Sequence, residues 1–388
     1  MKSLPLDGIT VISLEQAVAA PFATRQLADL GARVIKIERD SGDFARGYDQ
    51  SVEGMASYFV WLNRSKESVV LDLKSDEGQQ VLHELIADAD VLVQNLAPGA
   101  VQRLGFGAED ALEINPRLIH TSISGYGQGG PYEQKKAYDL LVQCEAGMLS
   151  VTGSQDEVAK VGISVADVCA GMYAYTGILT ALFNRMKTGK GEVIEVSMLE
   201  ALAEWMGQPY FYAQYSGTQQ PRTGAQHATI APYGPFEAAG GTVFFGIQNE
   251  REWQKFCAEV LDDPAIGNDE RFANNTLRVA NREALHEAID QVLATLDVEQ
   301  AVARLDAAGI ANARMRDMHE LSAHPQLEAR NRWVDVDSPV GPLRSLRPPV
   351  TTQNSGIRMD PVPALGEHTE RVLAEVRQRR KARGNAGS

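Results

Sequence analysis

The chain opens with Ile9-Thr-Val-Ile-Ser-Leu14, a short alternation of apolar residues that is typical of a strand. Residues 17–30 have the pattern of a helix ending at Gly31, and Arg33-Val-Ile-Lys-Ile-Glu-Arg39 reads as a second strand. A strand–helix–strand unit within about thirty residues predicts a parallel, Rossmann-like sheet. The turn after the first strand reads Gln16-Ala-Val-Ala-Ala-Pro21 instead of GxGxxG, so the sequence does not support a nicotinamide or flavin cofactor.

Further strand and helix patterns extend this unit into an α/β fold. Strands are expected within 63–74, 91–100, 118–124 and 192–196, with helices at 75–87, 138–148 and 198–206. Four glycines and one proline within Gly125–Pro131 predict a loop. We expect a Rossmann-like large domain (1–207 and 330–388), a linker (208–235), a smaller α+β domain (236–325) and a disordered basic tail after about Arg377.

The composition is that of a soluble protein with an acidic balance. The net charge of −14 argues against general binding to nucleic acids or anionic membranes. The start of the chain lacks a signal core, and we expect no apolar run of about 18 residues. Three separated cysteines and histidines without metal-ligand spacing predict a cytoplasmic protein with no disulfide framework and no metal site.

One carboxylate, Asp167, has a distinctive context in Gly162-Ile-Ser-Val-Ala-Asp167. We expect it to stand between an extended run, 161–165, and a helix rich in small residues. Gly171, Ala174, Gly177 and Ala181 share one face of that helix and would let another backbone approach closely. Taken alone, Asp167 has two interpretations: a helix N-cap, or a reactive group at the mouth of a cleft.

A set of cations follows the predicted strands of the first half, where open α/β sheets bind ligands and where phosphates would need basic partners. They are either anion ligands or ordinary surface charges: Arg39, Arg46, Lys66, Lys74, Arg103 and Lys136.

Many motifs, in order along nearly the whole chain, resemble those of family III (CaiB/BaiF-type) CoA-transferases, a family that also contains α-methylacyl-CoA racemases. The matching motifs are Ala20-Pro21, Gly31–Arg39, Ser41–Asp43 with Arg46, Asn63–Lys66, Leu71–Lys74, Asp90–Asn95, Pro98–Ala100, Arg103–Phe106, Asn115–Arg117, Gly125–Gly127, Ala166-Asp167, Thr188–Gly191 and Gly366–Thr369.

The resemblance implies that Asp167 is the nucleophile. It also implies an interlocked-ring homodimer in which each chain threads the other, and coenzyme A as a substrate with no tightly bound cofactor. The residues that it places around the CoA site are Arg39, Lys74, Asn95, Leu96, Arg103 and Lys136, with Tyr138 and Asp139 at its border.

The residue types fit acyl transfer between thioesters. Attack by the Asp167 carboxylate on an acyl-CoA would give a mixed anhydride and then an aspartyl-CoA thioester. With an unperturbed pKa of about 3.9, we expect Asp167 to be ionised at neutral pH. A racemase would need a histidine where this chain has Tyr138, a poor base, so that alternative is disfavoured. A CoA-binding regulator without catalysis is a further alternative, although it would not need Asp167.

The acceptor is predicted from similarity to branches that use succinyl-CoA with C4 or C5 dicarboxylates, such as itaconate, mesaconate, citramalate or malate. Intramolecular CoA transfer within mesaconyl-CoA is a related alternative. Oxalate is doubtful, because Val18 stands where formyl-CoA transferases carry glutamine. The distal carboxylate of the acceptor needs a cation or hydrogen-bond donors, for which Arg46, Arg222 and His227 are the candidates.

Overall fold

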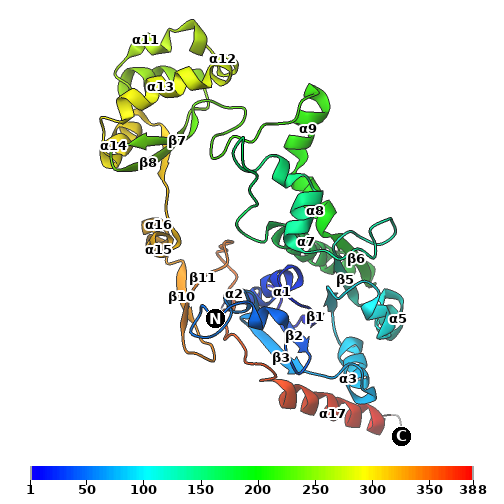
Figure 1. Ribbon diagram of the computed structural model, residues 1–388. Coiled ribbons are helices and arrows are strands. Elements are labelled where there is room, and N and C mark those ends of the chain that lie inside the picture. Colours follow the sequence, from blue (N-terminus) through cyan, green and yellow to red (C-terminus); the bar gives the residue numbers. More distant parts are fainter. Residues whose placement is uncertain (1, 387–388) are drawn as a thin grey trace. The chain divides into compact units, whose positions relative to one another are not determined.

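The computed structural model describes residues 2–386, which form two compact units (Figure 1). The first unit consists of residues 1–147, 161–207 and 327–388, and the second of residues 148–160 and 208–326. The stretch 148–160, which we assigned to the large domain, therefore groups with the second unit. The expected linker 208–235 also belongs to that unit and is not wholly irregular, because it contains most of α9 (Gly207–Ser216) and the start of β7 (Tyr233–Ala238).

A six-stranded, fully parallel sheet forms the centre of the first unit, in the order β3-β2-β1-β4-β5-β6. This confirms the predicted α/β fold. The strands are β1 (Thr10–Leu14), β2 (Arg33–Glu38), β3 (Lys66–Val70), β4 (Val91–Gln94), β5 (Ile119–Ser124) and β6 (Glu192–Ser197). The order reverses direction between β1 and β4, the kind of position where open α/β sheets bind ligands.

Helices cover both faces of this sheet. They are α1 (Ala19–Asp29), α2 (Ser57–Asn63), α3 (Asp76–Ala87), α4 (Ala100–Arg103), α5 (Ala108–Ile114), α6 (Asp139–Glu145), α7 (Val165–Thr188), α8 (Met198–Trp205) and α17 (Thr369–Ala386). On one face, Ile12 and Ile35 share a core with residues of α3, α5 and α17. The alternate strand residues point to the other face, where the Lys66 side chain reaches the carbonyl of Pro21 in α1.

The long helix α7 packs against α1, α8, β5 and β6. Gly171 allows the close approach of α1, because a Cβ there would stand 2.6 Å from the carbonyl oxygen of Ala19. The small-residue face predicted from the sequence is therefore confirmed at this contact. Among residues 2–386, α7 is also the one helix long and apolar enough to cross a membrane, which we did not expect, but half of the apolar window is buried in this unit.

The second unit combines a three-stranded antiparallel sheet with several helices. The sheet has the order β7-β8-β9, with β8 at Gly241–Gly246 and β9 at Ala311–Arg314. Trp253, Phe245 and Leu285 lie in its core. The helices are α10 (Glu250–Lys255), α11 (Pro264–Gly267), α12 (Asn275–Ala280), α13 (Arg282–Leu293), α14 (Val298–Ala308) and α15 (Met318–Ser322), with α16 (Pro325–Ala329) at the boundary of the two units.

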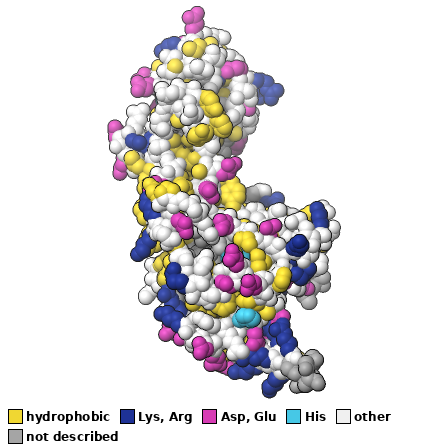
Figure 2. All heavy atoms as spheres, turned by 90° about the vertical axis from the view of Figure 1, so that its right-hand side faces the viewer, with side chains coloured by type: hydrophobic (Ala, Val, Ile, Leu, Met, Phe, Trp, Pro, Cys, Tyr) yellow, Lys and Arg dark blue, Asp and Glu magenta, His cyan; other side chains and the backbone are white. Residues whose placement is uncertain are grey.

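The C-terminal segment is ordered, so the prediction of a disordered tail after Arg377 is wrong for residues 377–386; residues 387 and 388 lie outside the described part. After the antiparallel pair β10 (Trp333–Val336) and β11 (Leu343–Leu346), the chain returns to the edge strand β3. There the Thr369 hydroxyl and the His368 ring accept hydrogen bonds from the amides of Val70 and Ser68. Arginines of α17 then pair with Glu84 and Asp88, and Figure 2 shows this mixture of charges.

We predict that Gly171→Ala lowers the free energy of unfolding by about 1–3 kcal/mol, because the added methyl group meets a backbone oxygen that cannot move without displacing α1. Urea denaturation measures the loss. Gly177→Ala is the matched control on the same helix, since its Cβ would meet side-chain atoms of Ile194, the nearest at 3.3 Å, and no backbone atom. Equal effects of the two substitutions would contradict this account.

Candidate active site

Asp167 lies in the first turn of α7, as the third helical residue. No strand precedes the helix: residues 161–164 are irregular and Ser164 occupies the N-cap position, so both the strand-to-helix junction and the N-cap interpretation of Asp167 are wrong. A helix N-terminus carries unpaired amides and partial positive charge, which favour an anionic group.

Asp139 at the start of α6 accepts the hydrogen bonds that a local N-cap would otherwise take. Its Oδ1 accepts from the amide of Ala166 at 2.7 Å and from that of Asp167 at 3.4 Å. The buried side chain of Gln143 holds the other oxygen, Oδ2, at 2.7 Å and in turn accepts from the amide of Val161. Asp139 therefore joins the N-termini of two helices and lies next to Asp167.

The surroundings of Asp167 raise its pKa to about 7. Burial is the main cause and the charge of Asp139 adds to it, while a hydrogen bond from the backbone of Ala19 acts in the opposite direction. With a pKa near 7, Asp167 is only partly ionised at pH 7, so the expectation that it is ionised at neutral pH holds only in part. A carboxyl that titrates near neutrality is typical of functional sites.

Three tyrosines lie around this end of α7. The Tyr58 hydroxyl is 3.0 Å from the Ser164 hydroxyl, and the Tyr48 ring stands edge-on to that of Tyr58 at 5.9 Å. Burial raises the pKa of Tyr48, and the charges of Asp43 and Asp167 and the neighbouring Tyr138 and Tyr58 add to the effect. Only Tyr138 was among the predicted residues, and its side chain is 70% exposed. Neither Tyr48 nor Tyr58 has a sequence spacing that links it to Asp167.

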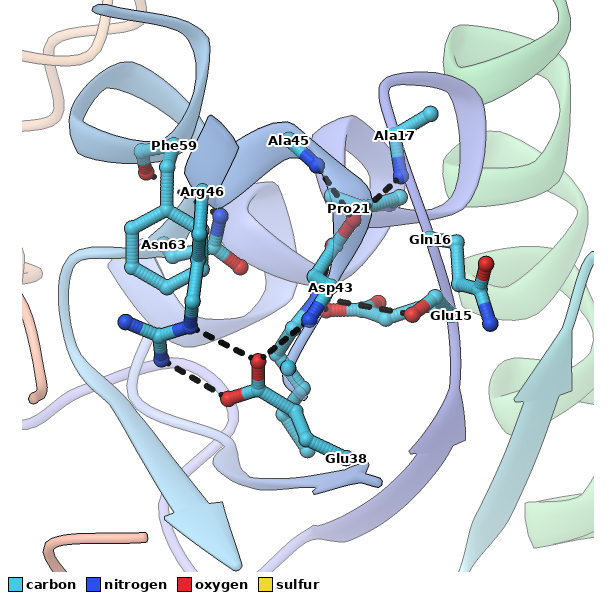
Figure 3. Close-up of polar contacts among 12 residues, drawn as sticks. Glu15, Gln16, Ala17, Pro21, Glu38, Asp43, Ala45, Arg46, Phe59 and Asn63 are labelled. Carbon is cyan, nitrogen blue, oxygen red and sulfur yellow. Dashed lines mark hydrogen bonds and ion pairs between the residues drawn. The ribbon is translucent and has the colours of Figure 1, made fainter. Parts of the chain in front are cut away.

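The turn between β1 and α1 leads to Ala19, whose backbone lowers the pKa of Asp167, and residues 15–18 of this turn contain no glycine. Asn95, at the end of β4, accepts from the Gln16 amide at 2.8 Å and donates to the Gln16 carbonyl at 2.9 Å. Ala17 has a φ of +62°, and its amide donates to Asp43 Oδ1 at 3.0 Å (Figure 3). Asn95, predicted to contact CoA, thus has a clear structural role in this turn.

A cleft of about 720 Å³ opens at the carboxyl ends of β1, β2 and β3. Three of the residues predicted around CoA line it: Arg39, Lys74 and Leu96. Both cations are exposed. Acidic residues, among them Asp40 and Asp72, line the same cleft, so its charge is mixed.

The other predicted cations do not line this cleft. Arg103 and Lys136 are exposed, and Arg103 donates only to the carbonyl of Pro98. Lys66 is fully buried. Arg46 makes a bidentate ion pair with Glu38 and lies on the Phe59 ring at 3.7 Å (Figure 3). The contacts of Arg46 argue against its use as the partner of a substrate carboxylate.

Arg222 and His227 belong to the second unit. Arg222 donates to the carbonyls of Ser154 and Gln155, both at 2.9 Å. The His227 ring stacks on Tyr233, and burial together with the charge of Arg282 lowers its pKa, so it is a neutral hydrogen-bonding group at pH 7. Within residues 2–386, no group of three or more His, Cys, Asp or Glu side chains could hold a metal ion.

Residues 6–369 match the model of CoA-transferase family III, and the chain is a member of that family. Its solved relatives include a CAIB/BAIF family protein from Brucella suis, with a TM-score of 0.86 and 32% identity, covering 97% of this chain and 100% of that one. Enzymes of this class use CoA thioesters as substrates.

Three relatives have names that specify different acceptors. The succinate–glutarate CoA-transferase of Agrobacterium fabrum is 33% identical, with 96% of each chain covered. The acetyl-CoA:oxalate CoA-transferase of Acetobacter aceti is 36% identical, with 85% of each covered. The succinyl-CoA:mesaconate CoA-transferase of Haloarcula hispanica is 31% identical, with 96% of each covered.

We predict that Asp167→Asn stabilises the protein at pH 8 but not near pH 4. The folded protein holds the Asp167 proton up to about pH 7, whereas the unfolded chain releases it near pH 4, so wild-type stability falls as pH rises between these values. Asparagine does not titrate. After allowance for partial exposure, we expect a gain on the order of 1–2 kcal/mol in urea denaturation. The raised pKa would be refuted if the free energies of unfolding of the variant and the wild type differ by the same amount at pH 4 and at pH 8.

Proposed function

We propose that this protein transfers CoA from succinyl-CoA to a C4 or C5 dicarboxylate, with Asp167 as the nucleophile. The observation that carries the proposal is the position of the Asp167 carboxyl in the first turn of α7, next to Asp139, where burial raises its pKa. A thioester is an activated acyl donor, so a positioned carboxylate can attack it without metal or nucleotide.

The proposed reaction has four steps, and in each of them one acyl bond forms as another breaks. An Asp167 oxygen attacks the thioester carbonyl, the C–S bond breaks, and CoA leaves as a thiolate from the mixed anhydride. The thiolate attacks the Asp167 carbonyl carbon, which releases succinate and gives the aspartyl-CoA thioester. The acceptor carboxylate then attacks this thioester to form a second anhydride and thiolate. Attack of the thiolate on the acceptor's acyl carbon gives the new acyl-CoA and restores Asp167.

Backbone amides are the groups best placed to stabilise the negative charge that develops on oxygen in these steps. The backbone of Ala19, at the start of α1, lowers the pKa of the Asp167 carboxyl, whereas the α7 amides of Ala166 and Asp167 are already bound by Asp139. Arg39 and Lys74, in the cleft at the strand ends, are proposed to hold CoA phosphates. Arg222 and His227 are proposed to donate to the distal carboxylate of the acceptor.

A dicarboxylate acceptor is supported by the names of the glutarate and mesaconate transferases among the relatives. Glutarate and mesaconate are both C5 dicarboxylates, as are itaconate and citramalate. The oxalate transferase of similar identity has a shorter acceptor, so oxalate belongs in any test.

The working assembly is proposed to be a homodimer. In the first unit, α7 and the edge strand β6 form a hollow of about 570 Å³ that contains Tyr173 and Phe183. In the second unit, Tyr210, Phe211 and Tyr215 of α9 are exposed. Large exposed apolar groups and an open edge strand are features that a second copy of the chain could cover.

The decisive experiment incubates the protein with succinyl-CoA and each of glutarate, itaconate, mesaconate, citramalate, malate and oxalate, and reads new acyl-CoA species by mass spectrometry. We expect one C4 or C5 acid to give a new thioester, and Asp167→Asn to give none. Asp156→Asn, at an exposed position of the second unit, is the control. If no acid exchanges, single acyl-CoA substrates would test an intramolecular CoA shift or a racemase reaction, and the proposal would fail.

The pH dependence of kcat/KM gives a second prediction. Only ionised Asp167 attacks, so kcat/KM for the acyl-CoA should rise with pH and level off above about 7. Asp139→Asn should move the rise of kcat/KM to lower pH, because it removes the neighbouring charge; its Oδ1 can still accept from Ala166, although its new amide group faces the donor Gln143 Nε2. If kcat/KM rises over the same pH range in both proteins, the charge of Asp139 does not influence the pKa of Asp167.

A further inference from the structure

The first turn of α7 receives its cap from another helix. The amides of Val165 and Val168 donate to carbonyls of the same segment, at 2.8 and 3.0 Å. Between them, the amides of Ala166 and Asp167 both donate to Oδ1 of Asp139, at 2.7 and 3.4 Å. A helix is usually capped by the residue that precedes it. Here a carboxylate of α6 binds the two amides that the segment itself leaves over.

The residue in the N-cap position of α7, Ser164, does not take this role. Its side chain makes no hydrogen bond to the first turn of α7, and its hydroxyl lies 3.0 Å from the hydroxyl of Tyr58. Serine is among the residues that most often cap a helix, so its use elsewhere leaves the cap to Asp139. The backbone that carries Asp167 is therefore held by a side chain whose own position has to be fixed.

A buried glutamine fixes the side chain of Asp139. Gln143 is four residues further along α6, on the same face of the helix, and it is fully buried. Its Nε2 donates to Asp139 Oδ2 at 2.7 Å, and its Oε1 accepts from the amide of Val161 at 3.0 Å. A carboxylate only accepts and a backbone amide only donates, so this place requires one donor and one acceptor on the same side chain.

The helix that carries both side chains is itself held against the sheet. Gly125, at the end of β5, lies so close to Ala137 that a Cβ on Gly125 would collide with the Cβ of Ala137. The carbonyl of Gly125 also accepts from the amide of Leu199 in α8, at 3.1 Å. The helix α6 then packs against α7 and α8. Gln143 thus links the start of α7 to a fixed part of the first unit.

We propose that Gln143 is a positioning residue for catalysis: by holding the carboxylate of Asp139, it fixes the first turn of α7, which carries Asp167. Because Gln143 is fully buried, it acts through Asp139 and not on the substrate. The inference rests on the proposed function, in which Asp167 attacks the thioester. A displacement of a reacting group by about 1 Å can slow a reaction about a hundredfold, so a small shift of this turn would be felt in kcat.

The first test compares Gln143→Met with a control that removes a similar set of hydrogen bonds elsewhere. Methionine has nearly the length of glutamine but cannot replace its amide. In the control, Asn115→Leu, the lost amide donates to the carbonyls of Ile86 and Ala89, at 3.1 and 2.8 Å. Asn115 precedes β5, at the opposite end of the sheet from the cleft. Both variants should unfold at lower urea concentration, because both leave buried polar groups without partners.

Only Gln143→Met should affect the candidate site. We expect its kcat for CoA exchange to fall on the order of tenfold to a hundredfold. Its KM for the acyl-CoA should change little, since Arg39 and Lys74 in the cleft are untouched. Hydrogen exchange, read by mass spectrometry on peptides that contain residues 161–167, should become faster, because the amides there lose their partners. In Asn115→Leu, kcat and the exchange of this segment should stay as in the wild type.

The second test exchanges the donor and the acceptor between the two side chains. In Gln143→Glu two carboxylates face each other, and in Asp139→Asn two amide groups do, so each single variant loses the contact. In the double variant, the asparagine can donate to the glutamate and still accept from Ala166, and the glutamate can accept from Val161. The total charge equals that of the wild type. At pH 8, we expect kcat of the double variant to exceed that of either single variant on the order of tenfold.

Two results would overturn the positioning role of Gln143. One is that Gln143→Met and Asn115→Leu change kcat and the exchange of residues 161–167 alike. The other is that the double variant is no more active than the two single variants, a result that also decides the matter if Gln143→Met does not fold. Absence of CoA exchange by the wild-type protein would instead refute the proposed function, while hydrogen exchange would still test whether Gln143 holds the start of α7.

Discussion

The close approach of α1 and α7 is the constraint on which the candidate site depends. Gly171 is what permits it, because any side chain at that position would collide with the carbonyl of Ala19. The backbone of the same residue, Ala19, also lowers the pKa of Asp167, which lies one helical turn earlier in α7. The contact of α1 with α7 at Ala19 therefore affects both the packing of the two helices and the surroundings of Asp167. A change in the distance between these helices would also change the environment of this carboxyl.

The sequence predicted the elements of the sheet well because their signals are local. Residues 9–39 contain a strand, a helix and a second strand whose patterns need no tertiary information, and β1, α1 and β2 lie within a few residues of the predicted bounds. The C-terminal helix was missed because its stability is not local: α17 is held by Val372 and Val376 in the core and by ion pairs to α3. The helix α9 was missed within a stretch rich in Gln, Gly, Pro and Tyr.

The candidate site was predictable only in part. Asp167, Asp139 and Tyr138 were identified through the family resemblance, and the structure brings them together at the start of α7. The pKa of Asp167 could not be predicted, since burial and the charge of Asp139 depend on the packing of α6 against α7. Tyr58 and Asp43 come from distant elements and have no pattern that relates them to Asp167.

Several of the motif residues that carry the family resemblance make structural contacts in this protein. Asn95 and Lys66 were candidate ligand contacts in the sequence, yet each of them, like the Gly366–Thr369 motif, ties one backbone segment to another. Burying charges such as Lys66 and Glu15 is costly, and well-packed apolar residues often give equal or greater stability at such places. Their presence beneath the first turn of α1 is better explained by the geometry that they impose. Charged side chains on one side and Asn95 on the other hold this turn without glycine, and they thereby fix the direction in which the chain enters α1.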